Sequence, residues 1–474
     1  MCVRLSTINN RTGCASYTNG NEGQLRYANN ITQILNLINS DIKYPIALVL
    51  PLTMISKIVL DTVQNGFNDN DLAGIIFVQE NDNLVPPINK DGFSVDQKSP
   101  MYYLRPNTQM NNNIYEWNKQ GTSIMFNEYE FSIIALNAAE SSNITDMARD
   151  NENSILNNNF GVYFAEFNYP MIASNDSITC LNNDNCLPLG GYSVWTTFQN
   201  MSIDNYNYSA LDRKLILAIT SIDTTALFHN SITRGGNANQ AGLVAFLGAI
   251  NALSNIKDIM SSLEKQIIFA AFEGETYDLV GSRKFIYDIT MNESCNEYMQ
   301  SDYGFGCWEP YSSTLEYKKL NLSLIDFIIE LNQIGISNEN NDRIIYTHYE
   351  TKNSYIDSVI NDLKNISQII SEQKKIGYSI QEPITSINGT GTPPSSFWSF
   401  LDYNISIPGI VLSDFETEYK NKWFHSVYDS FYNSLNMEQI CMTSTLYARM
   451  LYKMAANDEQ YNDTIMNEYI NADC

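Results

Sequence analysis

The hydrophobic positions fall into short runs that predict buried strands, later in alternation with helices. In the first 140 residues, apolar runs separated by polar turns predict three strands, at 46–50, 72–78 and 131–136. From residue 214 onward the pattern becomes regular, with strands predicted at 214–220, 266–272 and 407–412 and helices at 241–253, 282–288 and 437–454. Alternating strands and helices predict an α/β fold in which helices cover both faces of a sheet.

Two polar stretches interrupt this pattern. Residues 81–120 are rich in Asn and Pro and contain no predicted element. So long an irregular stretch in a compact domain is typical of a functional loop. Residues 142–159 are polar and are expected to form a helix that crosses to a second domain. The length of 474 residues agrees with more than one domain.

The charge balance is strongly acidic, with 28 Lys and Arg against 53 Asp and Glu and a net charge of −25. Nucleic-acid binding relies on basic side chains that neutralise phosphate, so this composition argues against a nucleic-acid partner. The apolar fraction of 44% is ordinary for a globular protein. The sequence contains no run of about 18 apolar residues, so we expect no membrane span within it.

Paired cysteines and glycosylation motifs indicate a secreted or lumenal ectodomain. Eight cysteines allow 105 pairings, and the simplest one joins sequence neighbours: Cys2–Cys14, Cys180–Cys186, Cys295–Cys307 and Cys441–Cys474. Candidate glycosylation sites are the asparagines of the Asn-x-Ser/Thr sequons, at Asn10, Asn30, Asn143, Asn175, Asn200, Asn207, Asn292, Asn321, Asn365, Asn388, Asn404 and Asn462. We expect a chain expressed without its leader and without a membrane anchor.

Three segments resemble the metal-binding segments of co-catalytic zinc aminopeptidases. Residues 269–282 resemble the strand end that carries a ligand and the catalytic base in those enzymes. Residues 235–242 resemble their helix start, and residues 423–430 resemble their C-terminal histidine segment. Such enzymes hold two zinc ions with two His, two Asp and one Glu, and a separate Glu acts as general base.

This resemblance implies a peptidase-like fold that has lost its metal site. Four of the five ligand positions fall on residues of other types: Ser221, Ala238, Thr276 and Asn332. Only His425 stands where the family has a ligand, and Glu275 stands at the general-base position. We therefore expect no catalytic residue, no bound metal and no cofactor.

A further resemblance, to the nicastrin family, spans nearly the whole chain. Residues 274–282 read Gly-Glu-Thr-Tyr-Asp-Leu-Val-Gly-Ser, which is similar to the family's G-E-T-F-D-Y-I-G-S. Residues 393–406 are similar to its P-P-S-S and N-I-S tracts, and residues 116–118 and 193–195 fall where it has Q-W-N and N-V-W. One departure is Leu279, which replaces the family's tyrosine.

The family is the large ectodomain subunit of γ-secretase, so the resemblance implies a bilobed ectodomain. A small N-terminal lobe would span residues 1–175 and send a lid, at about 81–120, over the other lobe. A zinc-aminopeptidase-like α/β sandwich with a mixed central sheet would span residues 176–474. Trp117 would be the lid's plug over the pocket, and Phe228 would lie near the contact between the lobes.

The resemblance also implies a function without catalysis. The pocket would recognise the free N-terminus of a membrane-protein stub, with Glu275 receiving the ammonium and Asp278 and Leu279 beside it, or would exclude long ectodomains by bulk. The implied partners are presenilin, two small multi-pass subunits and type I membrane-protein stubs. The implied location is the extracellular or lumenal side of the endoplasmic reticulum, Golgi and plasma membrane, on a single-pass protein whose anchor is absent from this sequence.

Two other classes of function stay open at this point. One is a divergent one-zinc aminopeptidase, or a glutaminyl-cyclase-like acyltransferase, that uses His425, Glu275 and an unrecognised ligand. The other is a glycosylated adhesion or scaffolding ectodomain whose pocket is vestigial. Bound zinc would favour the first of these. Unchanged processing of γ-secretase substrates after substitution of Glu275 would favour the second.

Overall fold

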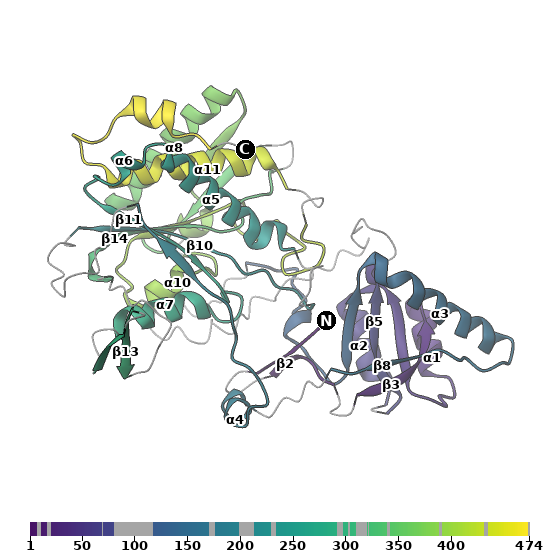
Figure 1. Cartoon of the computed structure of the whole chain (residues 1–474). Helices are drawn as coiled ribbons and strands as arrows, with labels where there is room; N and C mark the ends of the chain where they lie inside the picture. The colour runs from purple at the N-terminus through teal and green to yellow at the C-terminus, as the bar shows by residue number, and fades with distance from the viewer. Residues whose placement is uncertain are drawn as a thin grey trace.

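The computed structural model has two α/β lobes, which confirms the predicted fold class (Figure 1). Strands of the larger sheets come from residues 21–167 in one lobe and from residues 194–413 in the other. The structure describes residues 1–6, 11–16, 20–68, 70–79, 117–169, 176–198, 213–228, 234–291, 297–301, 304–309, 320, 322–338, 342–387, 391–430 and 435–472, with the backbone alone at 291, 297–301 and 304–309. Most of the expected lid, 81–120, lies outside these residues.

The large lobe is built on a mixed sheet of seven strands in the order β16-β15-β17-β14-β10-β11-β9. The strands are β9 (Val194–Thr196), β10 (Leu215–Ser221), β11 (Gln266–Phe272), β14 (Ile325–Leu331), β15 (Arg343–His348), β16 (Tyr378–Gln381) and β17 (Gly409–Ser413). The four central strands β17, β14, β10 and β11 run parallel, whereas β9 and β15 pair antiparallel with their neighbours β11 and β17. The predicted mixed central sheet is therefore present.

Helices cover both faces of this sheet because its central strands are apolar on both sides (Figure 1). One face packs against α5 (Ala241–Ser254), α8 (Ser354–Lys374) and α11 (Met437–Ala455). The other face packs against α7 (Val280–Met291) and α10 (Phe397–Tyr403). Shorter elements of this lobe are η5 (Gly236–Gln240), α6 (Lys257–Met260), η7 (Leu322–Leu324), α9 (Ile384–Ile387), η9 (Ile465–Tyr469) and the hairpin of β12 (Glu297–Ser301) and β13 (Gly304–Glu309). The short helix α4 (Ser177–Asn182) lies between the two lobes (Figure 1).

The small lobe contains a five-stranded sheet in the order β7-β5-β4-β3-β8 and a three-stranded sheet in the order β1-β2-β6. Its strands are β1 (Arg4–Ser6), β2 (Arg11–Cys14), β3 (Asn21–Tyr27), β4 (Ile46–Pro51), β5 (Leu72–Val78), β6 (Glu128–Tyr129), β7 (Ser132–Leu136) and β8 (Phe164–Phe167). Its helical segments are α1 (Ile31–Ile38), η1 (Leu52–Met54), α2 (Lys57–Gly66), η3 (Ile124–Phe126) and α3 (Ala138–Leu156).

The helix expected at 142–159 is present as α3, but it does not cross to the second lobe. It packs on the small-lobe sheet, where Ala148 joins the core formed with Leu25 and Val49. Asn151 anchors it, because its side-chain amide donates to the backbone oxygens of Leu25 and Tyr163. One face of α3 is buried although the helix has few apolar residues. The polar composition of the segment does not reveal this face.

A hydrophobic cluster joins the two lobes. Phe228 of the large lobe is fully buried and makes an edge-to-face contact with Phe77 of β5, at 6.0 Å between ring centres. Trp423, Val427 and Tyr428 belong to the same cluster. The Tyr428 hydroxyl also donates a 2.9 Å hydrogen bond to the Leu52 backbone oxygen. The segment that follows β17 is therefore part of the small-lobe core.

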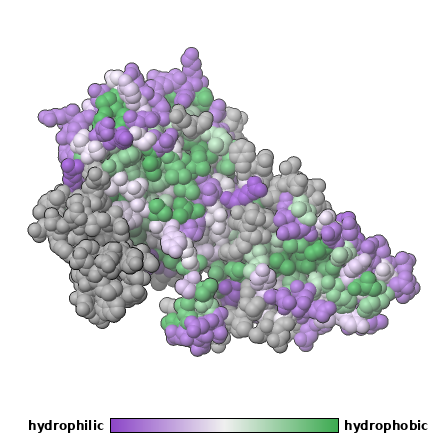
Figure 2. Space-filling view, in the orientation of Figure 1, coloured by the Kyte–Doolittle hydropathy of each residue, from purple (hydrophilic) through white to green (hydrophobic). Residues whose placement is uncertain are grey.

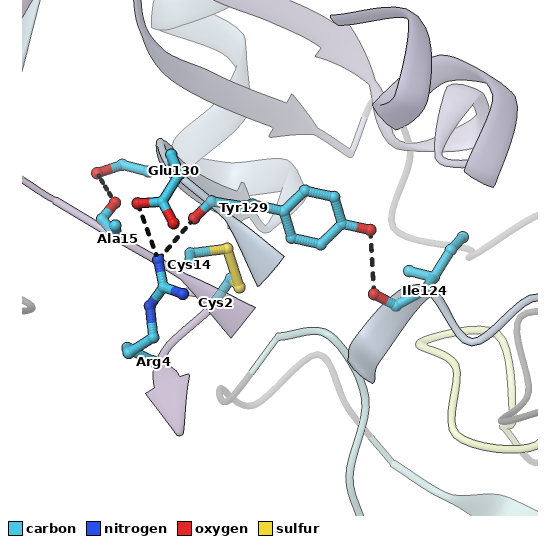
Figure 3. Close-up of a disulfide and its surroundings, with 8 residues drawn as sticks. Cys2, Arg4, Cys14, Ala15, Ile124, Tyr129 and Glu130 are labelled. Atoms are coloured by element: carbon cyan, nitrogen blue, oxygen red, sulfur yellow. Dashed lines mark hydrogen bonds and ion pairs between the residues drawn. A yellow bond between two sulfur atoms is a disulfide. The ribbon is translucent and has the colours of Figure 1, made fainter. Parts of the chain in front are cut away.

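Two disulfides join pairs of described residues. Cys2 is joined to Cys14, beside the Arg4 side chain that donates to the Tyr129 backbone oxygen (Figure 3). Cys180 is joined to Cys186 at the end of α4. Ile178 in α4 and Leu187 after it are 54% and 90% exposed. At the place of α4, Figure 2 shows hydrophobic residues beside hydrophilic ones. Cys441 is also disulfide-bonded, while Cys295 and Cys474 lie outside the described residues.

Substituting Phe228 with Ala should destabilise the chain by about 3–5 kcal/mol, because it removes a fully buried ring from the cluster that joins the lobes. Chemical denaturation, with limited proteolysis between the lobes, measures the effect. Tyr192→Ala is the matched control, since Tyr192 is 87% exposed and its loss should change stability by no more than about 0.5 kcal/mol. Equal effects of the two substitutions would contradict the role given to Phe228.

Candidate functional site

A pocket opens at the carboxyl end of β10, β11 and β14. The chain passes from β10 to β11 on one side and then returns to β14 on the other side of β10, so the sheet order reverses there. Ligands of open α/β sheets bind at such switch points. The cavity measures about 110 Å³ and is lined by Trp117, Asn118, Phe126, Ser221, Asn239, Glu275, Thr276, Leu279, Glu330, Asn332, Pro394, Ser395, Ser396, Tyr419, Phe424 and His425.

Glu275 is buried in the wall of this pocket and holds three hydrogen bonds. Its Oε1 accepts from the Ser282 backbone N–H at 2.7 Å. Its Oε2 accepts from the hydroxyls of Ser282 and Ser396, at 2.8 and 2.6 Å. Gly281 permits the approach, because a Cβ there would lie 2.9 Å from Oε1. Since a carboxylate offers about four acceptor positions, Oε1 keeps one for a further donor.

A second buried carboxylate, that of Glu330 in β14, lines the same pocket. Its oxygens accept the backbone N–H groups of Ser396 and Phe397, at 3.0 and 2.8 Å. Burial raises the pKa of Glu275 to about 7 and the pKa of Glu330 to about 8, although these hydrogen bonds oppose the rise. The pocket therefore contains two acids whose ionisation is costly without a compensating positive charge.

Asp223 fixes the loop that presents Glu275. Its two carboxylate oxygens accept the backbone N–H groups of Glu275 and Thr276, each at 3.0 Å. The Ser221 hydroxyl donates to the same carboxylate at 3.0 Å. A side chain at the end of β10 thus holds the turn that follows β11, and the two strand ends behave as one unit.

The structure brings four of the five positions that match zinc ligands to one pocket. Ser221, Thr276, Asn332 and His425 all line it. Ala238 is buried in η5 and does not line it, and its backbone N–H donates to Asp429 at 2.9 Å. In the part of the chain that the structure describes, no group of three or more His, Cys, Asp or Glu side chains lies where it could hold a metal ion.

His425 adopts an unusual backbone conformation between the pocket and the lobe contact. Its φ of 59° lies in the left-handed region, and its ring stacks on Phe424. It lines the pocket and also a small apolar cavity that Phe228 lines from the lobe contact. Burial lowers its pKa to about 3, so the ring is uncharged at neutral pH.

The lid and lobe residues lie at different parts of the site. Trp117 lines the pocket, and its ring meets the His348 ring edge-on at 5.3 Å. Its backbone oxygen accepts a 2.7 Å hydrogen bond from the Tyr419 N–H, which ties this end of the expected lid to the large lobe. Phe228 lies outside the pocket, in the cluster between the lobes.

Of the three residues expected to bind substrate, Asp278 is placed apart from the pocket. Its carboxylate pairs with the Arg283 guanidinium at 2.7 Å and is one-third exposed. Leu279 is buried and lines the pocket beside Glu275. Both residues have positive φ, 70° and 53°, so the turn that separates them from Glu275 is a sharp one.

Sequence reasoning missed Glu330 and three aromatic residues of the lining: Phe126, Tyr419 and Phe424. In the sequence each resembles an ordinary core residue near a strand or turn. The signal for Glu330 was an acid inside the apolar run 325–331, because a buried strand rarely carries a charge without a partner.

The expected glycosylation sites that the structure describes are accessible. These sequon asparagines are all exposed: Asn30, Asn143, Asn365, Asn404 and Asn462. The other sequon asparagines lie outside the described residues: Asn10, Asn175, Asn200, Asn207, Asn292, Asn321 and Asn388. Within the described ranges, no helix combines the length and apolar character needed to cross a membrane.

Comparison with known families matches both lobes. Residues 1–173 match the model of the nicastrin small lobe, and residues 214–465 match the model of the nicastrin large lobe. The chain belongs to the nicastrin family. A nicastrin of Arabidopsis thaliana is 27% identical over 484 residues, which cover 99% of this chain and 64% of that protein.

One solved structure agrees with the nicastrin fold. The crystal structure of the gamma-secretase component nicastrin aligns with a TM-score of 0.77 and 25% identity, covering 98% of this chain and 75% of that one. A zinc aminopeptidase from Bacillus subtilis aligns with a TM-score of 0.40 and 11% identity, covering 97% of this chain and 81% of that one. The chain spans less than two thirds of the length of the curated nicastrins that it matches.

The raised pKa of Glu275 predicts that part of the stability is lost as pH rises. The folded protein holds the proton up to a pKa of about 7, whereas the unfolded chain releases it near 4.5. Glu275 should therefore contribute a fall of about 3 kcal/mol in the free energy of unfolding between these values, and Glu275→Gln should remove this part of the slope while the part from Glu330 remains. Denaturation at pH 4.5, 6 and 8 measures it. Glu264→Gln, at an exposed acid, is the control and should keep the slope.

Proposed function

We propose that this chain is a non-catalytic, peptidase-like receptor that recognises the N-terminus of membrane-protein stubs for intramembrane proteolysis. In this proposal it acts in the extracellular space or the lumen of the secretory pathway, as a subunit of γ-secretase. Its partners there would be presenilin, two small multi-pass subunits and type I membrane-protein stubs. Membership of the nicastrin family supports the assembly, and the pocket supports the mode of recognition.

The observation that carries the proposal is the buried carboxylate of Glu275 with one acceptor position left on Oε1. An ammonium group placed there would compensate a charge that burial disfavours. Such charge-assisted hydrogen bonds contribute about 1.5–3 kcal/mol net. Aromatic rings of Trp117, Tyr419 and Phe424 line the same cavity and can favour a cation over their faces. The proposed ligand is therefore a primary ammonium.

The donor set in the pocket does not fit the two zinc ions of the peptidases that it resembles. Ser221, Thr276 and Asn332 offer neutral oxygens where Zn²⁺ prefers imidazole and carboxylate. At Ala238 the side chain is a methyl group. We propose that Glu275, in the position of a general base, serves binding instead of catalysis.

A second proposed mode of selection at the same site is the exclusion of long ectodomains by bulk. Trp117 lies against the pocket with 5% of its surface exposed and is held by Tyr419. In this reading the ectodomain would leave room for a short extracellular stub and not for a folded ectodomain of the substrate. This reading needs no contact with the ammonium.

Substituting Glu275 with Gln should reduce cleavage of a short stub with a free amino terminus by roughly 10- to 100-fold in γ-secretase assembled with the full-length protein. The variant keeps an acceptor for Ser282 and loses the charge that pairs with the ammonium. Cleavage is measured on the free stub and on the same stub with an acetylated N-terminus.

Glu273→Gln is the matched control, because Glu273 lies two residues earlier, is partly exposed and does not line the pocket. γ-Secretase assembled with this variant should cleave both stubs at the same rate as γ-secretase with the unsubstituted protein. If acetylation and Glu275→Gln both leave cleavage unchanged, ammonium recognition is wrong. Exclusion by bulk is then the remaining proposed mode of selection.

The purified chain should retain less than about 0.1 zinc per molecule after incubation with excess zinc and desalting. Four positions that match ligands carry Ser, Ala, Thr and Asn, so His425 has no set of partners at those positions. Metal analysis by mass spectrometry measures the content. Stoichiometric zinc that disappears in His425→Ala would instead favour the divergent enzyme.

A further inference from the structure

Glu330 lies on the central strand β14 of the large-lobe sheet and lines the pocket. It is the sixth residue of β14, where it pairs with Ile219 of β10 on one side and with Val411 of β17 on the other. Only 1% of its surface is exposed. A carboxylate in such a place needs hydrogen-bond donors, and the residues that supply them show what it does.

The two backbone donors come from the start of α10, from Ser396 just before the helix and from Phe397, its first residue. The N–H groups of Ser396 and Phe397 each bind one carboxylate oxygen of Glu330. The same Ser396 sends its hydroxyl in the other direction, to Oε2 of Glu275 at 2.6 Å. One loop residue therefore connects the acid on the strand to the acid in the wall of the pocket.

This connection determines which oxygen of Glu275 is left for a ligand. Ser282 and Ser396 occupy Oε2 through their hydroxyls, while Oε1 holds a single backbone donor. If the loop shifted and the Ser396 hydroxyl moved away, Glu275 would gain freedom to turn and its charge would lose a donor. Strands hold the side chains of a binding site more rigidly than loops do. Through its two hydrogen bonds, Glu330 attaches Ser396 and Phe397 to such a strand.

We propose that Glu330 is a positioning residue of the ligand site, which holds the Ser396 backbone so that the Ser396 hydroxyl orients Glu275. The proposal rests on the proposed role of Glu275 as the ammonium receptor. It differs from a role in stability alone, because a residue that merely anchors the start of α10 would act on Glu275 equally with or without the Ser396 hydroxyl.

Gln is the informative substitution at this position. Its side chain has the same shape, but it offers one carbonyl oxygen to two N–H groups and points an NH₂ group at the other one. Ser396→Ala removes the link to Glu275 and leaves both backbone N–H groups on Glu330. The two variants and their combination form a double-mutant cycle.

Two readouts are measured in γ-secretase assembled with the full-length protein. The first is the cleavage rate of a short stub with a free amino terminus, relative to its acetylated form. Glu330→Gln and Ser396→Ala should each reduce the preference for the free stub about tenfold, and the double variant should reduce it no more than about twofold further. Asp326→Asn, on the same strand but paired with Lys265 and Tyr355 away from the pocket, should leave it unchanged.

The second readout needs no ligand. Infrared difference spectra of the full-length protein across pH 5 to 9 identify the protonated carboxyl of Glu275, as the band that Glu275→Gln removes. Ser396→Ala and Glu330→Gln should each shift this band, and the double variant should match Ser396→Ala. If the band shifts as expected while acetylation of the stub has no effect, the ammonium receptor is wrong and the positioning role stands.

Additive effects of the two substitutions on the band would overturn the proposal, because Glu330 would then act without Ser396. An unmoved band in Ser396→Ala would overturn it as well. This single variant keeps the test decisive even if Glu330→Gln fails to fold.

Discussion

Buried carboxylates at the carboxyl end of the large-lobe sheet hold the loops of the site through backbone N–H groups. Asp223 binds the turn after β11, Glu275 binds the first turn of α7, and Glu330 binds the loop before α10. Asp414 binds the Ile336 N–H, and Asp429 binds the start of η5. Each carboxylate loses hydration on burial and recovers part of that energy only when the loop is in place. The geometry of the pocket depends on this replacement of hydration by hydrogen bonds to the loops.

Much of the fold could be predicted from the sequence because its strongest signals are local. The run 266–272 is apolar and β-rich, and it forms β11 with the predicted bounds. Residues 72–78 form β5 in the same way. For segment 142–159 the predicted crossing to a second domain is wrong, since its polar composition hides the buried face that Ala148 and Asn151 form against the small-lobe sheet.

The site could be predicted only where a motif carried it. Glu275, Thr276 and Leu279 lie in one recognisable segment, and Ser221, Asn332 and His425 follow from its alignment with a family. Asp278 belongs to the same motif, yet the sharp turn directs its carboxylate to Arg283. Glu330 and Phe126 carry no motif, and their place in the pocket results from strand pairing and lobe packing that no local pattern encodes.

The hydrogen bond from Tyr428 to Leu52 joins residues 376 positions apart. At ribosomal rates of about 5–20 residues per second, the small lobe waits roughly 20–75 s for this partner to be synthesised. During that interval the apolar surface that Trp423, Val427 and Tyr428 later cover is open to solvent. The core of the nascent small lobe is thus incomplete until the far end of the chain arrives. Completion of this core requires the same segment that supplies His425 to the pocket.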